Sequence, residues 1–510
     1  MTPPTTSDRF DVAIVGGGIN GAVSAAALSS KGYRVLLIDR EDFGGVTSSQ
    51  SSNLIWGGIK YLQTYEFALV FKLCIARFRL MRNYPTRVRS IGFFASLGPS
   101  APFGKFMGTI GTLVYWAIGL FTTPAPRTFG LKKTLEMEPS IARDKLSGSV
   151  LYFDGMLPDN DSRFVWDFVK KSTDLGAVAL NYVELVSAKK IANGFQLGLR
   201  DNISGQASNV EASIVVNAAG PYVKPVNDLL AVETQNGLLF SKGIHLVVRK
   251  LTEDKRILAF WDEQGRLFYV IPMHDRSVIG TTDTRVIDPA EGVTDADRDF
   301  VLRQINKSLS LSDPLTNSDI ISERCGVRAL VSNNPERAAT QDWHKLSRKH
   351  FVESNKDGVI SILGGKFTDC LNVGDEIIRE VRKFLPKPES SKKWVGEDQI
   401  SYREQLVQRV NGLLGQTTEA DEIAAQLWRR HGLQSHQILN IMEAHPEDQQ
   451  PVFQGLGITF AEIRYILENE QIRTPADLLR RRLPIAMVRT PKEIAENSRL
   501  QALLSKAGVL

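Results

Sequence analysis

Cysteine is scarce in this sequence: Cys74, Cys325 and Cys370 are the three among 510 residues. They lie far apart, so their spacing predicts neither a disulfide framework nor a metal site. The N-terminal stretch MTPPTTSDRF lacks an apolar segment between a basic start and a cleavage site, and so it does not resemble a secretory signal. We therefore expect a protein of the reducing cytoplasm.

A strong net charge is missing as well. The formal charge of +5 is small for 510 residues and does not indicate a nucleic-acid partner. Apolar residues make up 43% of the chain, which is typical of a globular protein rather than a disordered one. A chain of this length exceeds one ordinary hydrophobic core, so we expect two or three domains.

The basic residues are unevenly placed. Residues 60–89 carry many Lys and Arg but the single acid Glu66, and residues 106–126 carry no charge. Glycines and prolines interrupt the uncharged stretch, and clear flanking anchors are absent, which argues against a transmembrane helix. Two alternatives remain open. The region either seats the protein peripherally on the inner face of the cytoplasmic membrane, or forms a buried pair of core helices.

The stretch DVAIVGGGINGAVSA, residues 11–25, has the order strand, tight turn and helix. Gly16 permits the turn, Gly18 lets the backbone approach a pyrophosphate, and Gly21 lets the helix pack on the strand. Asp39 ends the next apolar run, where a ribose hydroxyl needs an acceptor. Together these features predict a dinucleotide site at the N-terminus of the helix.

Two further stretches favour FAD over NAD. A second fingerprint of strand, glycines and helix does not occur, so one tightly held cofactor is expected. Residues 44–58 are rich in glycine and small hydroxyl residues, as expected of a loop around a long flavin nucleotide. Gly364 and Gly365 precede a predicted helix whose N-terminus could face the flavin ring, where negative charge gathers on reduction.

Seven motifs occur in a fixed order: DVAIVGGGINGA, TSSQSSNLIWGGIKYL, VNAAGPYVK, KGIHLVV, VIGTTDT, CGVRAL and GGKFT. In order and spacing they resemble the FAD-dependent glycerol-3-phosphate dehydrogenase family, and the tail motif LWRRHG extends the resemblance over nearly the whole chain. The resemblance implies oxidation of sn-glycerol 3-phosphate to dihydroxyacetone phosphate, with quinone or oxygen as electron acceptor. We also expect that the chain could form a homodimer.

The predicted fold class is α/β with α+β. It comprises a discontinuous Rossmann-like FAD-binding domain (8–100, 150–236 and 355–390), a sheet-rich substrate-capping domain (101–149 and 237–354) and a C-terminal helical domain (395–510). The residues expected to bind the cofactor are Gly16, Gly18, Gly21, Asp39, Thr47, Ser48, Ser49, Ala218, Gly220, Gly365, Lys366 and Thr368.

Oxidation of a secondary alcohol needs a group that takes the hydroxyl proton. His245 in KGIHLVV is the first candidate, a structural histidine being the alternative, and His274 is a weaker one. Arg328 would orient the substrate and stabilise oxyanion character, and Lys366 would lie beside the flavin or the substrate anion. Either cation could instead belong to a surface ion pair.

Several residues depart from the family pattern. Trp56 replaces a histidine, Lys60 before Tyr61 replaces an arginine, and Gln341 stands where a cation is usual. Lys and Gln cannot form forked contacts to phosphate, each worth about 1.5 to 3 kcal/mol, although a nearby arginine at 337 could restore one cation. Asp369 and the cysteine after it also depart from the usual threonine and tyrosine.

Three functions follow from these observations. The first is oxidation of glycerol 3-phosphate or a similar polyol phosphate, with substrate contacts from Trp56, Lys60, Tyr61, Arg328 and Gln341. The second keeps the flavin chemistry but acts on a different hydroxyl or amine compound. The third is a flavin-binding, membrane-associated interaction protein without turnover.

Overall fold

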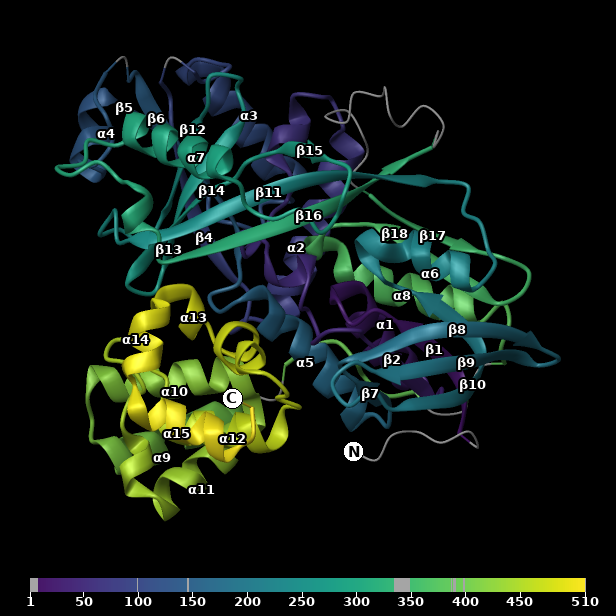
Figure 1. The fold of residues 1–510 in the computed structure, drawn as a ribbon. Coiled ribbons are helices and arrows are strands. Elements are labelled where there is room, and N and C mark those ends of the chain that lie inside the picture. The colour runs from purple at the N-terminus through teal and green to yellow at the C-terminus, as the bar shows by residue number, and fades with distance from the viewer. Residues whose placement is uncertain are drawn as a thin grey trace.

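The structure is a computed structural model that describes residues 8–98, 100–144, 146–333, 349–386, 388, 391–397 and 400–509. Two β-sheets and a helical C-terminal domain make up the fold (Figure 1). This architecture confirms the predicted α/β with α+β class. Gln341 and Arg337 lie outside the described residues.

The first sheet has a parallel centre. Its strands follow the order β17-β18-β10-β1-β2-β7, with β9 pairing β10 and β8 pairing β9. The bounds are β1 Arg9–Val15, β2 Val35–Ile38, β7 Val178–Leu180, β8 Val183–Ile191, β9 Gly194–Asp201, β10 Ala207–Asn217, β17 His350–Ser354 and β18 Val359–Gly364. Parallel pairing of β1 with β2 and β10 places their carboxyl ends at one edge. In such sheets ligands bind outside that edge.

Helices cover this sheet. Helix α1 (Ile19–Ser29) packs against both α5 (Asp161–Asp174) and α8 (Cys370–Val381). The alanine-rich sequence of α1 is buried almost throughout, which small side chains allow at close helix-to-sheet distance. The short helix α6 (Val223–Leu229) packs on β18 and β8.

The second sheet follows the order β15-β11-β14-β13-β12-β4-β6-β3, with β16 pairing β11 and β5 pairing β6. The bounds are β3 Leu54–Ile55, β4 Arg89–Ser96, β5 Arg127–Gly130, β6 Gly148–Met156, β11 Gly237–Arg249, β12 Ile257–Trp261, β13 Leu267–Met273, β14 Arg276–Gly280, β15 Thr284–Val286 and β16 Ser322–Ser332. Helices α4 (Leu131–Met137) and α7 (Asp295–Ser308) accompany it.

The structure moves the expected domain boundaries. Strands β3 and β4, within the predicted segment 8–100, and β6, at the start of 150–236, pair in the second sheet. Strand β17 lies within the predicted segment 237–354 but pairs in the first sheet. The reason is that an apolar run predicts a strand, whereas the sheet that it joins depends on long-range pairing.

Helices α2 (Phe67–Asn83) and α3 (Lys105–Ile118) occupy the basic and uncharged region and pack against each other. Helix α2 buries Leu69, Leu73 and Leu80 but exposes Phe67 and Phe71. One face of α2 is therefore core, as the buried alternative predicts, and peripheral contact with a membrane stays a prediction. Across the described ranges, every helix is too short or too polar to cross a bilayer.

The C-terminal domain lies beside α5 and below the second sheet (Figure 1). Its bounds are α9 Ser401–Leu414, α10 Thr418–His431, α11 Ser435–Ala444, α12 Phe460–Asn469, a π-helical turn Asp477–Arg482, α13 Ile485–Val488, α14 Pro491–Glu496 and α15 Ser498–Lys506. Thr417 and Thr459 cap the N-termini of α10 and α12 by accepting backbone hydrogen bonds.

Buried charges fasten this domain to α5. Glu462 accepts hydrogen bonds from Arg430 Nε and Nη2 at 2.5 and 2.8 Å. Glu470 pairs with Arg163 of α5 at 2.5 Å. Burial opposes ionisation, but the guanidinium of Arg430 outweighs it and lowers the pKa of Glu462 to about 2. The pKa of Glu470 falls to about 2 for the same reason, with Arg163 as the main partner.

We expect Glu462→Gln to lower the free energy of unfolding by about 3 kcal/mol, because the buried guanidinium of Arg430 loses its close carboxylate partner and keeps the longer ion pair with Asp159, at 3.3 Å. Because the folded pKa is depressed, the contribution of this carboxylate is present above the unfolded pKa near 4.5 and is lost as pH falls towards 2. Denaturant unfolding of wild type and variant at pH 7 and pH 3 should show a gap that narrows in acid. An equal gap at both pH values would contradict this account.

Candidate active site

A cavity of about 1750 Å³ lies between the two sheets. Its wall combines the glycine turn before α1, residues 45–67, strands β11 and β16, and the turn 364–368. In the part of the chain that the structure describes, none of the lining residues belongs to the C-terminal domain. The predicted residues at this wall are Gly16, Gly18, Asp39, Thr47, Ser48, Trp56, Lys60, Tyr61, Ala218, Gly220, His245, Arg328, Gly365, Lys366 and Thr368.

The glycine turn leaves no room for side chains. Gly16 has a φ of +104°, and a Cβ there would lie 2.6 Å from the carbonyl oxygen of Ala218. A Cβ on Gly21 would lie 1.8 Å from the carbonyl oxygen of Gly16, so this glycine lets α1 approach the turn and does not itself line the cavity. Gly18 is the N-cap of α1 and provides no side-chain cap. The helix N-terminus is therefore suited to a phosphate group.

Asp39 is fixed at the end of β2. Its carboxylate accepts hydrogen bonds from the backbone N–H of Gly17 at 2.6 Å and of Glu41 at 2.9 Å. Burial raises the pKa of Asp39 to about 7. Each carboxylate oxygen can accept a further hydrogen bond, as a ribose hydroxyl would supply. The cradle and this acid fit the adenosine diphosphate part of FAD.

The hydroxyl residues of the following loop have different roles. Ser48 Oγ accepts the N–H of Ile19 at 3.1 Å, and Thr47 Oγ1 donates to the carbonyl of Val327 at 2.9 Å. Ser49 was predicted to bind the cofactor, but its hydroxyl donates to carbonyls of its own loop and it does not line the cavity. The correction has a physical reason: a three-residue 3₁₀ turn points successive side chains in different directions.

The turn 364–368 meets the glycine turn across the cavity. Gly364 and Gly365 have φ values of +62° and +103°, and Asn20 Nδ2 donates to the carbonyl of Gly364 at 3.2 Å. Thr368 Oγ1 donates to the carbonyl of Trp56 at 3.2 Å. A 3₁₀ turn at Phe367–Asp369 leads into α8, so the expected helix start lies a few residues after the glycines.

Cations and aromatic rings gather beside this turn. Lys366 Nζ lies 4.0 Å from the ring centroid of Tyr61 and 5.3 Å from that of Trp56. Lys60 Nζ lies 5.8 Å from the Tyr61 ring. The ring faces attract these ammonium groups and hold them near the cavity. Two of the predicted cations therefore share one aromatic wall.

His245 is 1% exposed and projects from β11. Its Nε2 lies 2.8 Å from Ser52 Oγ, and its Nδ1 has no hydrogen-bond partner among the described residues. Burial, and then the charges of Arg324 and Arg328, lower the pKa of His245 well below 6.5. The imidazole is therefore neutral at pH 7, the form that a general base requires.

Arg328 lies on β16 and crosses β11 at Gly243, where a Cβ would lie 2.2 Å from its Nη2. Its guanidinium donates to Thr281 Oγ1 at 3.3 Å and lies 3.5 Å from Asp283 Oδ1. Sequence reasoning missed Asp283, although it lies within the quoted motif VIGTTDT. The motif gave no signal that this acid faces the arginine.

His274 does not reach the cavity. It lies in the turn between β13 and β14, and its surroundings include Asp159 and the charges of Arg429 and Arg430 from the C-terminal domain. Burial lowers the pKa of His274 to about 4. The weaker candidate for the base is therefore a residue of the domain interface.

A buried cluster behind Trp56 was also missed. Asp154 of β6 pairs with Arg77 of α2 and accepts the hydroxyl of Tyr115 at 2.9 Å and the N–H of Gly57 at 3.1 Å. The cluster fixes the loop that carries Trp56. Arg77 is one of many basic residues in the stretch 60–89, but it is buried, and a run of arginines gives no signal for which one turns inward.

Solved structures share this fold. The glycerol-3-phosphate dehydrogenase from Bacillus halodurans complexed with FAD superposes with a TM-score of 0.75, at 22% identity over 99% of this chain and 92% of that chain. The L-alpha-glycerophosphate oxidase from Mycoplasma pneumoniae, with FAD bound, gives a TM-score of 0.58, at 17% identity over 76% of this chain and 97% of that chain.

Curated relatives match over similar lengths. The aerobic glycerol-3-phosphate dehydrogenase of Bacillus subtilis is 29% identical over 97% of this chain and 91% of its own length. That of Staphylococcus epidermidis is 28% identical over 93% and 86%. The family model of FAD dependent oxidoreductases matches residues 11–366, and that of the C-terminal domain of alpha-glycerophosphate oxidase matches residues 393–506. The cradle, the acid and these matches agree: the chain belongs to the FAD-dependent oxidoreductase family.

Proposed function

We propose that the protein oxidises sn-glycerol 3-phosphate, or a similar polyol phosphate, to dihydroxyacetone phosphate. The observation that carries the proposal is the convergence on one cavity wall of a neutral buried base, His245, with the cations Lys366 and Arg328. The names of the curated relatives support the same substrate. Bound FAD supplies the acceptor for the hydride that leaves the alcohol carbon.

The protein's own residues prepare the alcohol. Ser52 lines the cavity and its Oγ lies 2.8 Å from Nε2 of His245, so the imidazole can take the alcohol proton through this hydroxyl, which gives its own hydrogen to Nε2 as it receives the proton of the alcohol. Arg328 stabilises oxyanion character on the substrate oxygen. Lys366 and Lys60 supply positive charge for the phosphate. Each does so through a single ammonium group, not through the two parallel hydrogen bonds that a guanidinium forms.

A second substrate class has one observation in its favour. Trp56 lines the cavity at the position where the family pattern has histidine, so the wall is more apolar than that pattern predicts. A different hydroxyl or amine compound, larger and less charged, would pack against this ring. The flavin chemistry and the role of His245 would be unchanged.

Anaerobic mixing separates these alternatives. We expect sn-glycerol 3-phosphate to bleach the flavin absorbance of the purified protein, with glycerol and inorganic phosphate as inactive controls. If another alcohol or amine bleaches the flavin and glycerol 3-phosphate does not, the substrate belongs to the second class. Indifference to a broad panel of alcohols, amines and hydroxy acids would indicate a flavin protein without turnover.

We expect His245→Gln to lower the rate of flavin reduction about a hundredfold or more, because the glutamine amide cannot take the hydroxyl proton in place of the imidazole. FAD content should stay at the wild-type level, since His245 lies apart from the glycine cradle. Because its pKa is lowered, wild-type reduction should keep its rate from pH 8 to pH 6.5 and fall only in stronger acid. His274→Gln is the matched control, and an equal loss there would contradict the assignment.

The electron acceptor is proposed to be quinone, with oxygen as the alternative, reached at a membrane surface. Helix α3 and the residues after it expose a row of apolar side chains: Phe106, Met107, Ile110, Leu113, Val114, Leu120 and Phe121. Residues 67–135 contain ten Lys and Arg and no acid. Exposed Lys105 and Arg127 border the row, so the surface suits an anionic bilayer.

Arg77 and Arg79 belong to the basic stretch 60–89, but they pair with Asp154 and Asp375. The proposed membrane contact therefore depends more on the apolar row of α3 than on these two arginines. The homodimer and the cytoplasmic location stay predictions.

We expect Phe106→Ser, Leu113→Ser and Phe121→Ser together to abolish flotation with phosphatidylglycerol vesicles, because the three side chains are exposed and support no core. Ile203→Ser with Ile287→Ser removes exposed apolar groups elsewhere and should leave flotation unchanged. Wild-type protein that stays with the soluble fraction would refute the membrane contact.

A further inference from the structure

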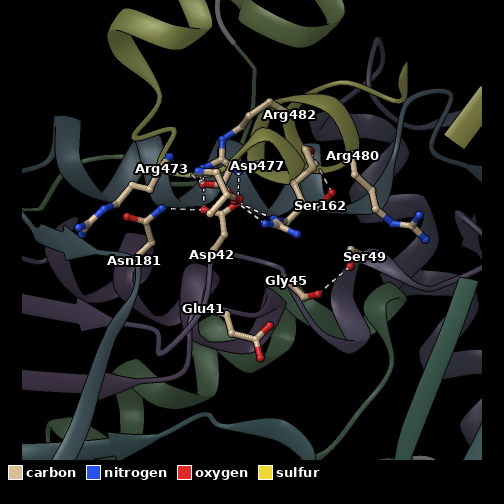
Figure 2. A network of polar contacts seen from close by, with 12 residues as sticks. Glu41, Asp42, Gly45, Ser49, Ser162, Asn181, Arg473, Asp477, Arg480 and Arg482 are labelled. Carbon is tan, nitrogen blue, oxygen red and sulfur yellow. Dashed lines mark hydrogen bonds and ion pairs between the residues drawn. The ribbon is translucent and has the colours of Figure 1, made fainter. Parts of the chain in front are cut away.

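A buried ion cluster joins the C-terminal domain to residues 42–49, which we call the cofactor loop (Figure 2). The carboxylate of Asp42 is fully buried and accepts four hydrogen bonds. Arg482 donates two of them at 2.8 and 3.0 Å, Arg481 Nε one at 2.8 Å, and Asn181 Nδ2 one at 2.9 Å. All the acceptor sites of this carboxylate are thereby used inside the protein.

Further contacts fix the positions of Arg481 and Arg482. Both lie at the end of the π-helical turn Asp477–Arg482, a rare form that recurs at functional sites. Arg481 also pairs with Asp477, whose carboxylate accepts the hydroxyl of Tyr182 at 2.7 Å. The guanidinium of Arg482 lies 4.1 Å from the ring centroid of Trp166. Figure 2 shows Arg480, the preceding residue, directed away from Asp42. It donates instead to the backbone of Glu323 in β16.

The cofactor loop connects this cluster to the cradle. Gly44 N–H donates to the carbonyl of Gly17 at 3.0 Å, and Gly45 N–H donates to that of Asp42 at 2.9 Å. A Cβ on Gly17 would lie 2.4 Å from the ring of Phe43, so the loop packs directly on the glycine turn. A shift of Asp42 would therefore move the loop and the turn together.

The C-terminal domain supplies no lining residue to the cavity among the described residues. Its ion pairs with the cofactor loop are those of Arg481 and Arg482 with Asp42. We propose that Arg481 and Arg482 clamp the cofactor loop, so that the affinity for FAD depends on a domain that does not line the FAD site. Asp42, Arg481 and Arg482 are positioning residues in this account. Buried ion pairs contribute little net stability, but they can fix the position of the groups that they join, here the cofactor loop and the C-terminal domain.

Arg473 provides a matched control. It also belongs to the C-terminal domain and pairs with the first-sheet domain, through Asp201 at 2.7 Å. Asp201 ends β9, outside the cofactor loop. The Arg473 guanidinium lies 5.9 Å from the ring centroid of Tyr182. A variant at Arg473 weakens the attachment of the domain but removes none of the four hydrogen bonds to Asp42.

The first experiment measures FAD binding to apoprotein by quenching of flavin fluorescence. Arg481→Gln and Asp42→Asn should each raise the Kd for FAD about tenfold or more, the effect of losing a buried charged hydrogen bond. Arg473→Gln should stay within about twofold of wild type, since it keeps the clamp. The side chain of Arg481 is 14% exposed, so water can take the place of the guanidinium in Arg481→Gln and the variant should fold. If Asp42→Asn does not fold, the FAD affinity of Arg481→Gln decides between the two outcomes.

Hydrogen exchange of the apoprotein gives a readout without FAD. The amides of Gly44, Gly45 and Ser49 should exchange faster in Arg481→Gln than in Arg473→Gln, with strand β1 unchanged. Wild-type FAD affinity in Arg481→Gln, or an equal loss of affinity in Arg473→Gln, would overturn the proposal. The substrate does not enter either measurement, so a failure of glycerol 3-phosphate to reduce the flavin leaves this result intact.

Discussion

The close contact between α1 and the strand ends of the first sheet decides where the rest of the site can lie. A Cβ at Gly21 would come within 1.8 Å of Gly16, and one at Gly16 within 2.6 Å of Ala218. Glycine at these positions therefore allows β1, α1 and β10 to meet at one point. The carboxyl ends of parallel strands gather there, and the helix N-terminus adds its partial positive charge. A phosphate site is the direct consequence.

The second sheet contributes what the cradle lacks. Strand β11 carries His245 and pairs with β16, which carries Arg328. The turn 364–368 comes from the first sheet and brings Lys366 to the aromatic wall. Base and cations thus come from two sheets and face one cavity. The buried cluster of Asp154, Arg77 and Tyr115 fixes β6, α2 and α3 against the loop that carries Trp56.

Sequence reasoning succeeded where the signal is local. The glycine spacing predicted the turn, and the apolar runs predicted β1, β2 and β11. It failed where the signal depends on distant partners. Nothing in the sequence around β4 tells which sheet it joins, and nothing in a run of arginines distinguishes buried Arg77 from exposed Arg82. The hydroxyl of Ser49 lies in a stretch of which several residues line the cavity, but its direction follows from the 3₁₀ turn.

Charge burial explains why the C-terminal domain belongs to the enzyme and is not an appendage. Arg163, Arg430 and Arg482 are all buried, and each has a carboxylate partner. Removing the domain would take from Asp42 and Asp159 the guanidinium groups that pair with them in the fold. The sequence places these partners more than 200 residues apart. The fold therefore couples the cofactor loop to the C-terminal domain through electrostatics.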